Sequence, residues 1–382
     1  MKFSIILSTS LAFGTTAAPS ANPATPKPKS VRILGNVTNP MQNRDSCCAT
    51  NFGNRAFWTC RDTMYKMSNG QWSFPFSNSV GWSEFNADGS PKLQHGGEVG
   101  PGSTGKNDIW LMKGPNPTLP DFFKTGPDMC PDSGACDDGS RWVGWPDTPP
   151  LITHTAADGT ITAYSWLTKT HLKGLTVQNQ EQPTSLYKMT YKPTADTNVV
   201  PNVTVVSYEF WKQHEIGYGT YGNIVSNGYV YAYGKAETNG SWIIGLARVP
   251  VGSVEQKSKY EYFVNGKWTR TIPKYTDSAA NVLNAGYGGQ GTFYYSKKHA
   301  SFFWIGQAGV SIAADFYMTS ASSPEGPWGK PYLIYQGPNK SSFSYSLQAH
   351  PYLLRPSDNG IYVTWTQTAD VYITPLAYIA FE

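Results

Sequence analysis

The sequence is short of charged residues, of cysteines and of long hydrophobic runs, and each shortage excludes a class of protein. Only 15% of the 382 residues are charged, and the net charge of +4 is spread along the chain without a cluster of Lys and Arg. Binding to nucleic acid or to an anionic membrane is therefore not indicated. No stretch after the N-terminus approaches the ~18 consecutive apolar residues of a transmembrane helix. No segment keeps a helical period for more than about two turns, so an all-β fold is expected.

The few cysteines and the missing motifs narrow the chemistry. The five cysteines include no CxxC pair and have no paired histidines nearby, which argues against a zinc site, and no cofactor is implied. Cys130 and Cys136 enclose a short polar loop and are expected to form a disulfide. Cys60 is expected to pair with Cys47 or Cys48, which leaves one thiol over. There is no GxSxG elbow, so serine hydrolysis is unsupported.

The N-terminus has the pattern of a secretory signal. A positive charge precedes the apolar stretch 3–13, and small residues follow it, so residues 1–18 are predicted to be a signal peptide. Residues 19–30 are predicted to be a flexible lead-in, and residues 31–382 a single secreted, extracellular domain. A monomer is expected. Four N-glycosylation sequons agree with export: Asn36, Asn202, Asn239 and Asn339.

Aromatic, strand-like segments recur along the chain. Five of them follow turns, and the last four are about 60 to 70 residues apart: AFWTC (56–60), TAYSWL (162–167), YVYAYG (229–234), SFFWIG (301–306) and IYVTW (361–365). This spacing suits four-stranded blades, and five copies predict a five-bladed β-propeller. A pair of β-sandwiches is the alternative. Strands at 31–37 and 372–381 would complete one blade and close the ring. The stretch 70–147, rich in Gly, Pro, Asn and Asp, is predicted to be a long loop insertion in the first blade.

Residues 44–65, RDSCCATNFGNRAFWTCRDTMY, carry two Arg-Asp pairs on either side of a turn signal and are predicted to form a β-hairpin. With the turn centred on the Phe-Gly step, Asp45 would lie opposite Cys60 and diagonal to Asp62, on the same face. Diagonal neighbours lie ~7–8 Å apart, which suits the ~6.5–9.5 Å of inverting glycosidases better than the ~5–5.5 Å of retaining ones. Inversion is therefore predicted, and it depends on this register. The alternative is that each Asp caps a turn or pairs with its neighbouring Arg.

Side chains just before the hairpins of the other blades are expected to converge with this pair on a central pocket. Carboxylates, amides and aromatic rings suit a neutral sugar and have little that would hold a phosphate. The residues expected to bind substrate are Arg44, Arg61, Asp147, Tyr221, Asn223, Gln290 and His350. For His350, packing in the core is an equal alternative. A third carboxylate could come from Glu98, Asp108, Glu209, Glu215 or Asp315, although a surface or structural role is favoured for each.

Several stretches resemble a known family. They are RDSCCATNFGNRAFWTCRDT, YGNIVSNGYVYAYG, LARVP (246–250) and SASSPEGPWGKPYLIYQ (320–336), and the resemblance runs from about Val31 to the C-terminus. The family is secreted, was long described as a domain of unknown function, and includes endo-D-arabinanases with a five-bladed β-propeller fold. The resemblance implies that Asp45 and Asp62 match the family's paired aspartates. Arg61 stands where that family commonly has Gly.

Together these features predict a secreted glycoside hydrolase that cleaves internal furanosidic bonds of a polysaccharide. Asp62, at the end of an aromatic strand, is expected to be the acid because burial would raise its pKa, and Asp45 is expected to be the base. The alternative is a non-catalytic, lectin-like propeller, which would need the aromatic and amide groups but not both carboxylates.

Overall fold

The computed structural model describes residues 26–37, 42–95, 108–112, 121–127, 129–130, 135–194, 196, 198–238, 241–339, 343–368 and 372–382. The predicted signal peptide, most of the lead-in, the sequon at Asn239 and the candidate Glu98 lie outside these residues. The described part consists of strands and of 3-10 helices of three residues each. None of its helices is long and apolar enough to cross a membrane.

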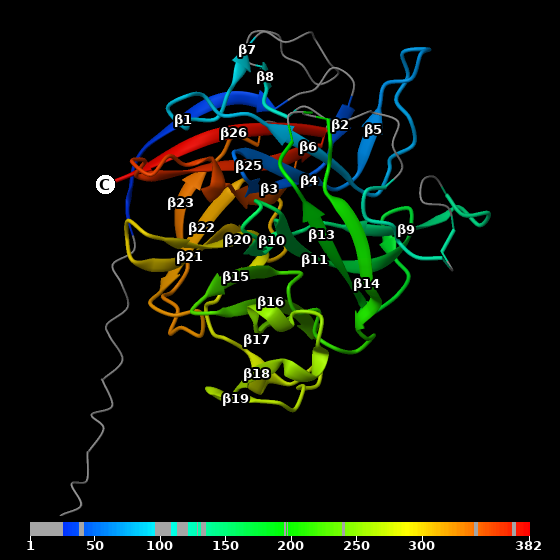
Figure 1. The fold of residues 1–382 in the computed structure, drawn as a ribbon, viewed down its shortest axis with the longest axis vertical. Helices are drawn as coiled ribbons and strands as arrows, with labels where there is room; N and C mark the ends of the chain where they lie inside the picture. The colour runs from blue at the N-terminus through cyan, green and yellow to red at the C-terminus, as the bar shows by residue number, and fades with distance from the viewer. Residues whose placement is uncertain are drawn as a thin grey trace, which may run out of the picture.

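The strands form five blades (Figure 1), in which all pairs are antiparallel except β1 with β8. Blade 1 consists of β3 (Cys47–Phe52), β4 (Arg55–Cys60) and β6 (Ser79–Ser83). Blade 2 consists of β10 (Leu151–Thr155), β11 (Ile161–Lys173), β13 (Thr184–Tyr191) and β14 (Asn202–Trp211), with β9 (Ser140–Trp145) and β12 (Thr176–Val177) paired to the far end of β11. Blade 3 consists of β15 (Gly222–Ser226), β16 (Tyr229–Thr238), β17 (Ser241–Pro250), β18 (Glu261–Val264) and β19 (Lys267–Thr269). Blade 4 consists of β20 (Gly288–Ser296), β21 (Ser301–Ala308), β22 (Asp315–Ala321) and β23 (Tyr332–Gln336).

Blade 5 combines both ends of the described chain. Its strands are β24 (Ser344–Ala349), β25 (Gly360–Thr368), β26 (Tyr372–Phe381), β1 (Pro28–Val37), β8 (Asp108–Trp110) and β7 (Gln94–His95). The innermost strands of neighbouring blades touch in the order β10, β15, β20, β24 and β3, which is the order expected around a central axis. The five-bladed propeller is therefore confirmed, and each recurrent aromatic segment lies in the second strand of its blade.

Strand β1 closes the ring as predicted. It pairs antiparallel with β26, from Pro28 opposite Phe381 to Val37 opposite Thr374. It begins ahead of the predicted start at Val31, so the last residues assigned to the flexible lead-in belong to the sheet. The stretch predicted to be a loop insertion is also more ordered than expected, because it supplies β6 to blade 1 and places β7 and β8 on the outer edge of blade 5 (Figure 1).

The core lies between the blades and is built largely from aromatic rings. The second strand of a blade has neighbours on both edges and other blades against both faces, so its side chains are buried on both faces and need not alternate with polar ones. Large side chains on these strands are at most 1% exposed: Trp58, Trp166, Tyr233, Trp304 and Trp365. Each such ring stabilises the fold by roughly 1.5–3 kcal/mol relative to exposure.

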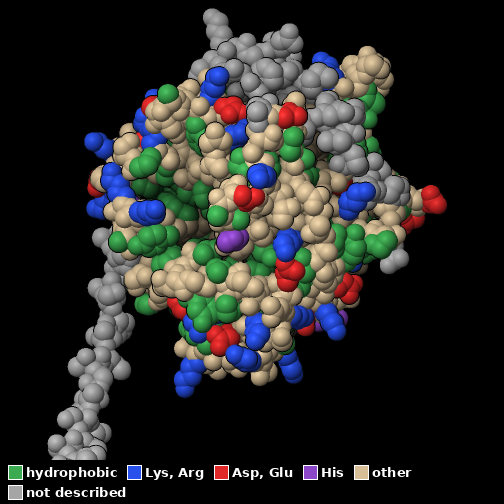
Figure 2. Space-filling view, viewed as in Figure 1, with side chains coloured by type: hydrophobic (Ala, Val, Ile, Leu, Met, Phe, Trp, Pro, Cys, Tyr) green, Lys and Arg blue, Asp and Glu red, His purple; other side chains and the backbone are tan. Residues whose placement is uncertain are grey.

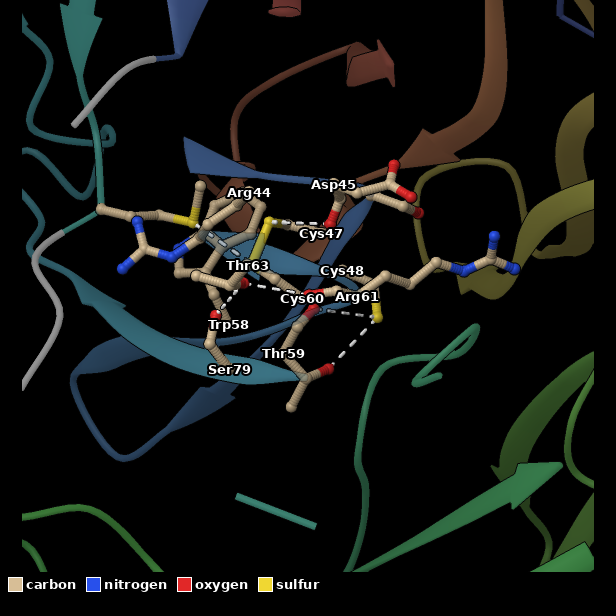
Figure 3. Close-up of a disulfide and its surroundings, with 12 residues drawn as sticks. Arg44, Asp45, Cys47, Cys48, Trp58, Thr59, Cys60, Arg61, Thr63 and Ser79 are labelled. Atoms are coloured by element: carbon tan, nitrogen blue, oxygen red, sulfur yellow. Dashed lines mark hydrogen bonds between the residues drawn. A yellow bond between two sulfur atoms is a disulfide. The ribbon is translucent and has the colours of Figure 1, made fainter. Parts of the chain in front are cut away.

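The structure settles the cysteine pairing that the sequence left open. Cys47 and Cys60 form a disulfide across β3 and β4 (Figure 3), and Cys130 pairs with Cys136 as predicted. Cys48 is the free thiol and is buried. Its side chain lies 3.3 Å from the Thr59 hydroxyl, and burial raises the pKa of the Cys48 thiol to about 12, so this thiol is kept unreactive.

Removing β1 should destabilise the whole ring, because β26 would become an unpaired edge. We expect a protein truncated through Val37 to melt well below one truncated through Thr25, which keeps β1. A loss of ~1 kcal/mol lowers the melting temperature of a large domain by roughly 2–4 °C, and the loss of a complete strand should exceed this several-fold. Differential scanning calorimetry of the two truncated proteins measures the difference. Equal melting temperatures would show that closure by β1 does not stabilise the ring.

Candidate active site

The turn of the first hairpin differs from the predicted one. Phe52 lies opposite Arg55, so the turn consists of Gly53 and Asn54 alone. Gly53 has a φ of +73°, which a tight two-residue hairpin turn requires and glycine adopts readily. Phe52 therefore stays in β3, where it is fully buried. The predicted register was wrong by two residues.

The hairpin ladder is interrupted where the two aspartates lie. The backbone N–H of Asp45 donates to the carbonyl of Asp62 at 2.8 Å, and the N–H of Arg61 donates to the carbonyl of Asp45 at 3.0 Å. The pairing keeps one register on either side of this point, with Arg44 opposite Thr63 and Cys47 opposite Cys60. No residue is therefore inserted, and the ladder is interrupted by the backbone of Ser46, which has a φ of +34°. Asp45 lies opposite Asp62 and not, as predicted, opposite Cys60. Because the error is an even number of residues, both carboxyls still share one face.

Asp62 accepts hydrogen bonds from two side chains of β9. Arg141 forms a bidentate ion pair with it, one arm of which is the 3.1 Å bond from Nη1 to Oδ1. The indole Nε1 of Trp145 donates to the same Oδ1 at 2.9 Å. The side chain is 7% exposed. Charge-assisted, bidentate bonds of this kind fix the position of a carboxylate.

The environment of the Asp45 carboxyl differs from that of Asp62. Asp45 is 6% exposed, and its Oδ1 has no hydrogen-bond partner among the described residues. Burial raises the pKa of Asp45 to about 7; the nearby charge of Arg61 opposes the rise, and that of Asp62 adds to it. Side-chain hydrogen bonds with Tyr345 and Thr366 also oppose it. The carboxyl with the raised pKa is therefore Asp45, whereas the sequence analysis expected such a shift at Asp62.

Three of the predicted binding residues meet beside this pair. The Nε of Arg61 donates to Oδ1 of Asp147 at 2.5 Å, and Nε2 of Gln290 donates to the same oxygen at 2.9 Å. The guanidinium of Arg61 also lies over the ring of Trp145, 5.0 Å from its centroid. Residues of blades 1, 2 and 4 are thus joined at the centre of the propeller, as the sequence analysis expected.

A cavity of about 710 Å³ opens next to this cluster between blades 2, 3 and 4. Its lining includes Arg61, Asp147, Tyr221 and Gln290, together with Trp145. Its other lining side chains are mainly amides, hydroxyls and three charged groups, namely Thr168, Thr170, Asn179, Gln180, Glu181, Gln182, Thr184, Thr220, Lys235, Glu237 and Tyr275. Asp45 and Asp62 do not line it themselves, and Arg61 and Trp145 form the wall nearest to them.

Three predicted binding residues do not reach this cavity. His350 is fully buried, packs on Trp58 and bonds the Thr364 hydroxyl through Nε2 at 2.7 Å. Burial lowers the pKa of His350 to about 3, so core packing, the alternative reading, is the one that the structure supports.

Arg44 and Asn223 are the other two residues that do not line the cavity. Arg44 is 6% exposed, and in Figure 3 its guanidinium lies on the opposite side of the hairpin from that of Arg61. Asn223 is buried and donates to the Thr148 hydroxyl at 3.2 Å. Arg44 bonds the Gln42 side chain and Asn223 the Thr148 side chain, and neither lines the cavity.

The described candidates for a third carboxylate do not line the cavity. Glu209 is 59% exposed beside Lys169, Glu215 pairs with Lys257, and Asp315 accepts from Gln336. Asp108 lies in β8, on the outer edge of blade 5. In the described part of the chain, no group of three or more His, Cys, Asp or Glu side chains is arranged to hold a metal ion.

Sequence reasoning missed two groups that hold the aspartates. Arg141 lies in β9, inside the stretch that its Gly, Pro and Asn content led us to interpret as a loop. Tyr345, which hydrogen-bonds Asp45, lies on β24, the innermost strand of blade 5. A signal existed for Tyr345, because it precedes Gln348 and His350 on the strand predicted to face the pocket.

The face of the molecule in Figure 2 carries acidic and basic side chains next to one another, without a continuous basic surface. This face therefore has no basic stripe of the kind that follows a nucleic-acid backbone. The mixture of charges agrees with the ion pairs in the described structure, in which Arg and Lys side chains are matched by carboxylates from neighbouring strands.

Comparison with known proteins gives one family match and several structural neighbours. Residues 154–365 match the model of a family described as a domain of unknown function, DUF5005. No curated protein matches the sequence significantly. The crystal structure of a Bacteroides ovatus protein, described provisionally as a hydrolase, is 15% identical and has a TM-score of 0.58; the match covers 91% of this chain and 87% of that one.

Two fungal enzymes are more distant. An exo-β-1,3-galactanase from Phanerochaete chrysosporium is 10% identical, with a TM-score of 0.46 and coverage of 92% of this chain and 64% of that one. The catalytic domain of an α-L-arabinofuranosidase of family GH62 from Coprinopsis cinerea is 9% identical, with a TM-score of 0.40 and coverage of 94% and 98%. At 15% identity the Bacteroides ovatus structure bears on the fold and not on the substrate, and at TM-scores below 0.5 the two fungal enzymes bear on neither.

The raised pKa of Asp45 should make stability depend on pH. In the folded protein this carboxyl keeps its proton up to about pH 7, whereas the unfolded chain releases it near the ordinary value of 3.8. Its stabilising contribution is thus full below about pH 4 and is lost as the pH rises to about 7. Asn mimics the protonated form. Between pH 5 and pH 8 the native protein should therefore lose roughly 2–3 kcal/mol of unfolding free energy relative to Asp45→Asn.

Urea unfolding of the two proteins at both pH values measures this difference. Asp137→Asn, at an exposed aspartate, is the control and should show no such change. A pH-independent difference between the native protein and Asp45→Asn would mean that Asp45 is ionised throughout this range.

Proposed function

The chain belongs to the family described as a domain of unknown function, DUF5005, and we propose that it is a secreted glycoside hydrolase that cleaves internal furanosidic bonds of a polysaccharide, as an endo-arabinanase does. One observation carries the proposal: a buried carboxyl, Asp45, whose pKa is raised to about 7, faces a carboxylate, Asp62, that is fixed by Arg141 and Trp145. Two carboxyl groups in unlike environments are what glycoside hydrolysis requires.

The roles follow from the environments. Asp45, which carries a proton near neutral pH, donates it to the glycosidic oxygen as that bond breaks. Asp62, an ionised carboxylate with a fixed position, attacks the anomeric carbon and forms a glycosyl ester. Asp45, now deprotonated, then takes a proton from the water that cleaves the ester, which restores both groups. This assignment reverses the sequence-based one, in which Asp62 was the acid.

The corrected register also changes the expected stereochemistry. Directly opposed residues on antiparallel strands have Cβ atoms ~4.5–5.5 Å apart, closer than the diagonal pair first assumed. This distance suits the ~5–5.5 Å carboxyl separation of retaining enzymes, which leaves no room for a water between acid and sugar. Retention therefore replaces the inversion predicted from the diagonal geometry.

The substrate class rests on the cavity and on the resemblance of the hairpin to endo-D-arabinanases. Carboxylate, amide and hydroxyl groups beside Trp145, Tyr221 and Tyr275 line the cavity. Such a lining suits the hydroxyls and C–H faces of a sugar. The structurally similar Bacteroides ovatus protein is described provisionally as a hydrolase, which is consistent with hydrolysis but does not specify a glycan.

Secretion is part of the proposal. It rests on the predicted signal peptide and agrees with the two disulfides, which persist in oxidising compartments. Among the described sequons, Asn202 is exposed and is the best placed for glycosylation. Asn339 is less suited, because its side chain bonds the backbone of Ile312 and Ala314.

Non-catalytic sugar binding is the competing function, and one observation favours it: neither Asp45 nor Asp62 lines the cavity.

A second alternative concerns the catalytic role of Asp147. It is 27% exposed and, alone among these three aspartates, faces the cavity, which makes it the alternative to Asp62 as the ionised partner. Asn variants of the three aspartates, assayed as follows, distinguish these alternatives.

We expect Asp45→Asn and Asp62→Asn each to lower activity by at least ~10²-fold, because each keeps the side-chain shape but removes proton transfer or nucleophilic attack. The assay is the release of new reducing ends from D-arabinan and from L-arabinan. Asp137→Asn is the surface control and should keep full activity. For the native enzyme, kcat/KM should fall above about pH 7 as Asp45 loses its proton.

The pattern of activity among these variants shows which aspartates take part in the reaction. Loss of activity in Asp147→Asn with a fully active Asp62→Asn would make Asp147 the partner of Asp45. A protein that binds arabinan but releases no reducing ends, in native and variant forms alike, would be a lectin-like propeller.

Retention should be visible in the first sugar released. Proton NMR recorded before mutarotation should show the anomeric configuration of the cleaved bond in the earliest product. The opposite configuration would show that water attacks the anomeric carbon directly, and Asp62 would then be a base rather than a nucleophile.

A further inference from the structure

Part of the cavity wall is built from two loops of blade 2 that are fastened together. The backbone N–H of His214 donates to the carbonyl of Glu181 at 3.1 Å, and Nδ1 of His214 lies 2.5 Å from Oε2 of Glu181. Nε2 of Gln213 donates to the carbonyl of Gln180 at 3.0 Å. The loop before β13 and the loop after β14 thus act as one wall, and Gln180, Glu181 and Gln182 face the cavity from it.

Both residues that join these loops have unusual backbone conformations. Glu181 has a φ of +45° and His214 a φ of +69°, in a region that residues other than glycine seldom occupy. Such conformations persist only where surrounding contacts impose them, and they concentrate at functional sites. Here the contacts present a carboxylate to the cavity. His214 engages one oxygen of Glu181, which leaves the other available to a ligand.

Blade 3 supplies the facing wall. Tyr275, Lys235 and Glu237 line the same cavity as Glu181, so one ligand can contact both walls. The Tyr275 oxygen accepts a hydrogen bond from the backbone N–H of Glu237 at 3.1 Å, which fixes the ring.

The cations on the cavity lining are matched, and this limits the ligand class. Arg61 pairs with Asp147, and Lys235 pairs with Glu237 at 2.8 Å. No cation on the lining is left unmatched, whereas a phosphate or a uronate would require one. Hydroxyls, amides and aromatic rings remain, and these are the groups that hold a neutral sugar.

The volume indicates more than one sugar residue. Pockets of ~300–1,000 Å³ enclose drug-sized molecules, and this one measures about 710 Å³. It is continuous from Asp147, beside the candidate catalytic pair, to Glu181. A glycan with one residue at Asp147 would place a later residue between Glu181 and Tyr275.

We propose that Glu181, oriented by His214, and Tyr275 form a distal subsite that binds a neutral sugar residue some way along the chain from the cleaved bond. This inference rests on the proposed function, since it concerns the same substrate. The Glu181 carboxylate accepts hydrogen bonds from two sugar hydroxyls, and the Tyr275 ring packs on the sugar's C–H face. The subsite makes the protein selective for long oligosaccharides.

The test uses the full-length mature protein and linear L-arabino-oligosaccharides, with D-arabinan fragments of matching size, from the disaccharide to the hexasaccharide. For the native enzyme kcat/KM should rise with substrate length. Glu181→Ala should lower kcat/KM on the longest substrates by about tenfold or more, the scale of a hydrogen bond to a charged group. It should do so through KM, with kcat unchanged, and should leave the shortest cleaved substrate unaffected.

Glu255→Ala is the matched control. Like Glu181, Glu255 is a half-exposed glutamate with one basic partner, here Lys188 at 2.8 Å, but it lies outside the cavity. It should reproduce the native length dependence. Melting temperatures of both variants check that the fold is intact. An equal loss on every substrate length, or no loss on any, would overturn the subsite.

Binding to the Asp45→Asn protein, measured calorimetrically, separates this inference from the proposed function. Length-dependent binding that Glu181→Ala weakens would support the subsite even if the native protein cleaves nothing, and the proposed hydrolysis alone would then fail. Equal binding with and without the Glu181→Ala change would overturn the subsite alone. No binding of any oligosaccharide would overturn it as well.

Discussion

The interrupted ladder at Asp45 is the feature on which the candidate site depends. In a regular hairpin, residues 45 and 46 would continue β3, and Arg61 and Asp62 would point to opposite faces. The interruption instead joins Asp45 to both of them, since its N–H donates to the Asp62 carbonyl and its own carbonyl accepts from the N–H of Arg61. It is fixed on both sides: the Cys47–Cys60 disulfide bridges the next pair along the hairpin, and β2 (Gln42–Arg44) and β5 (Thr63–Tyr65) resume the pairing beyond it. The geometry of the carboxyls is therefore set before any ligand binds.

The balance of charge around the interruption explains why the Asp45 carboxyl remains neutral. Three aspartates, Asp45, Asp62 and Asp147, meet two guanidiniums, and each guanidinium is committed to one carboxylate: Arg61 to Asp147 and Arg141 to Asp62. An additional buried negative charge would carry a desolvation penalty of several kcal/mol without a dedicated partner. Asp45 escapes the penalty by holding a proton. The chemistry proposed for it is thus a consequence of the number of arginines nearby.

The sequence predicted the fold well because the signals for it are local and repeated. Each blade contributes an aromatic second strand flanked by turns, and burial on both faces imposes that composition whatever the function. Closure by β1 was predictable for a similar reason, since an unpaired β26 would leave an exposed edge. Strands β6 to β9 were missed because their stretch is rich in Gly, Pro and Asn, and their pairing comes from distant strands.

The candidate site was predictable in its composition but not in its roles. The paired Arg-Asp motifs identified Asp45 and Asp62, and the position before each hairpin identified Asp147 and Gln290. The register error arose because a turn sequence allows several centres, and only the burial of Phe52 selects one of them. The roles of the two aspartates could not be separated from the sequence, because Arg141, which pairs with Asp62, approaches it from another blade. Spacing along the chain does not encode such an approach.

The state of Asp45 at neutral pH can be measured directly. Carbon NMR of protein labelled at the aspartate carboxyls, with Asp45→Asn used to assign the signal, follows the ionisation of this one group. Our account predicts that the signal present in the native protein and missing from the variant titrates near pH 7. A titration near the ordinary value of about 4 would show that Asp45 is ionised at neutral pH, and the proposed general acid would then be wrong.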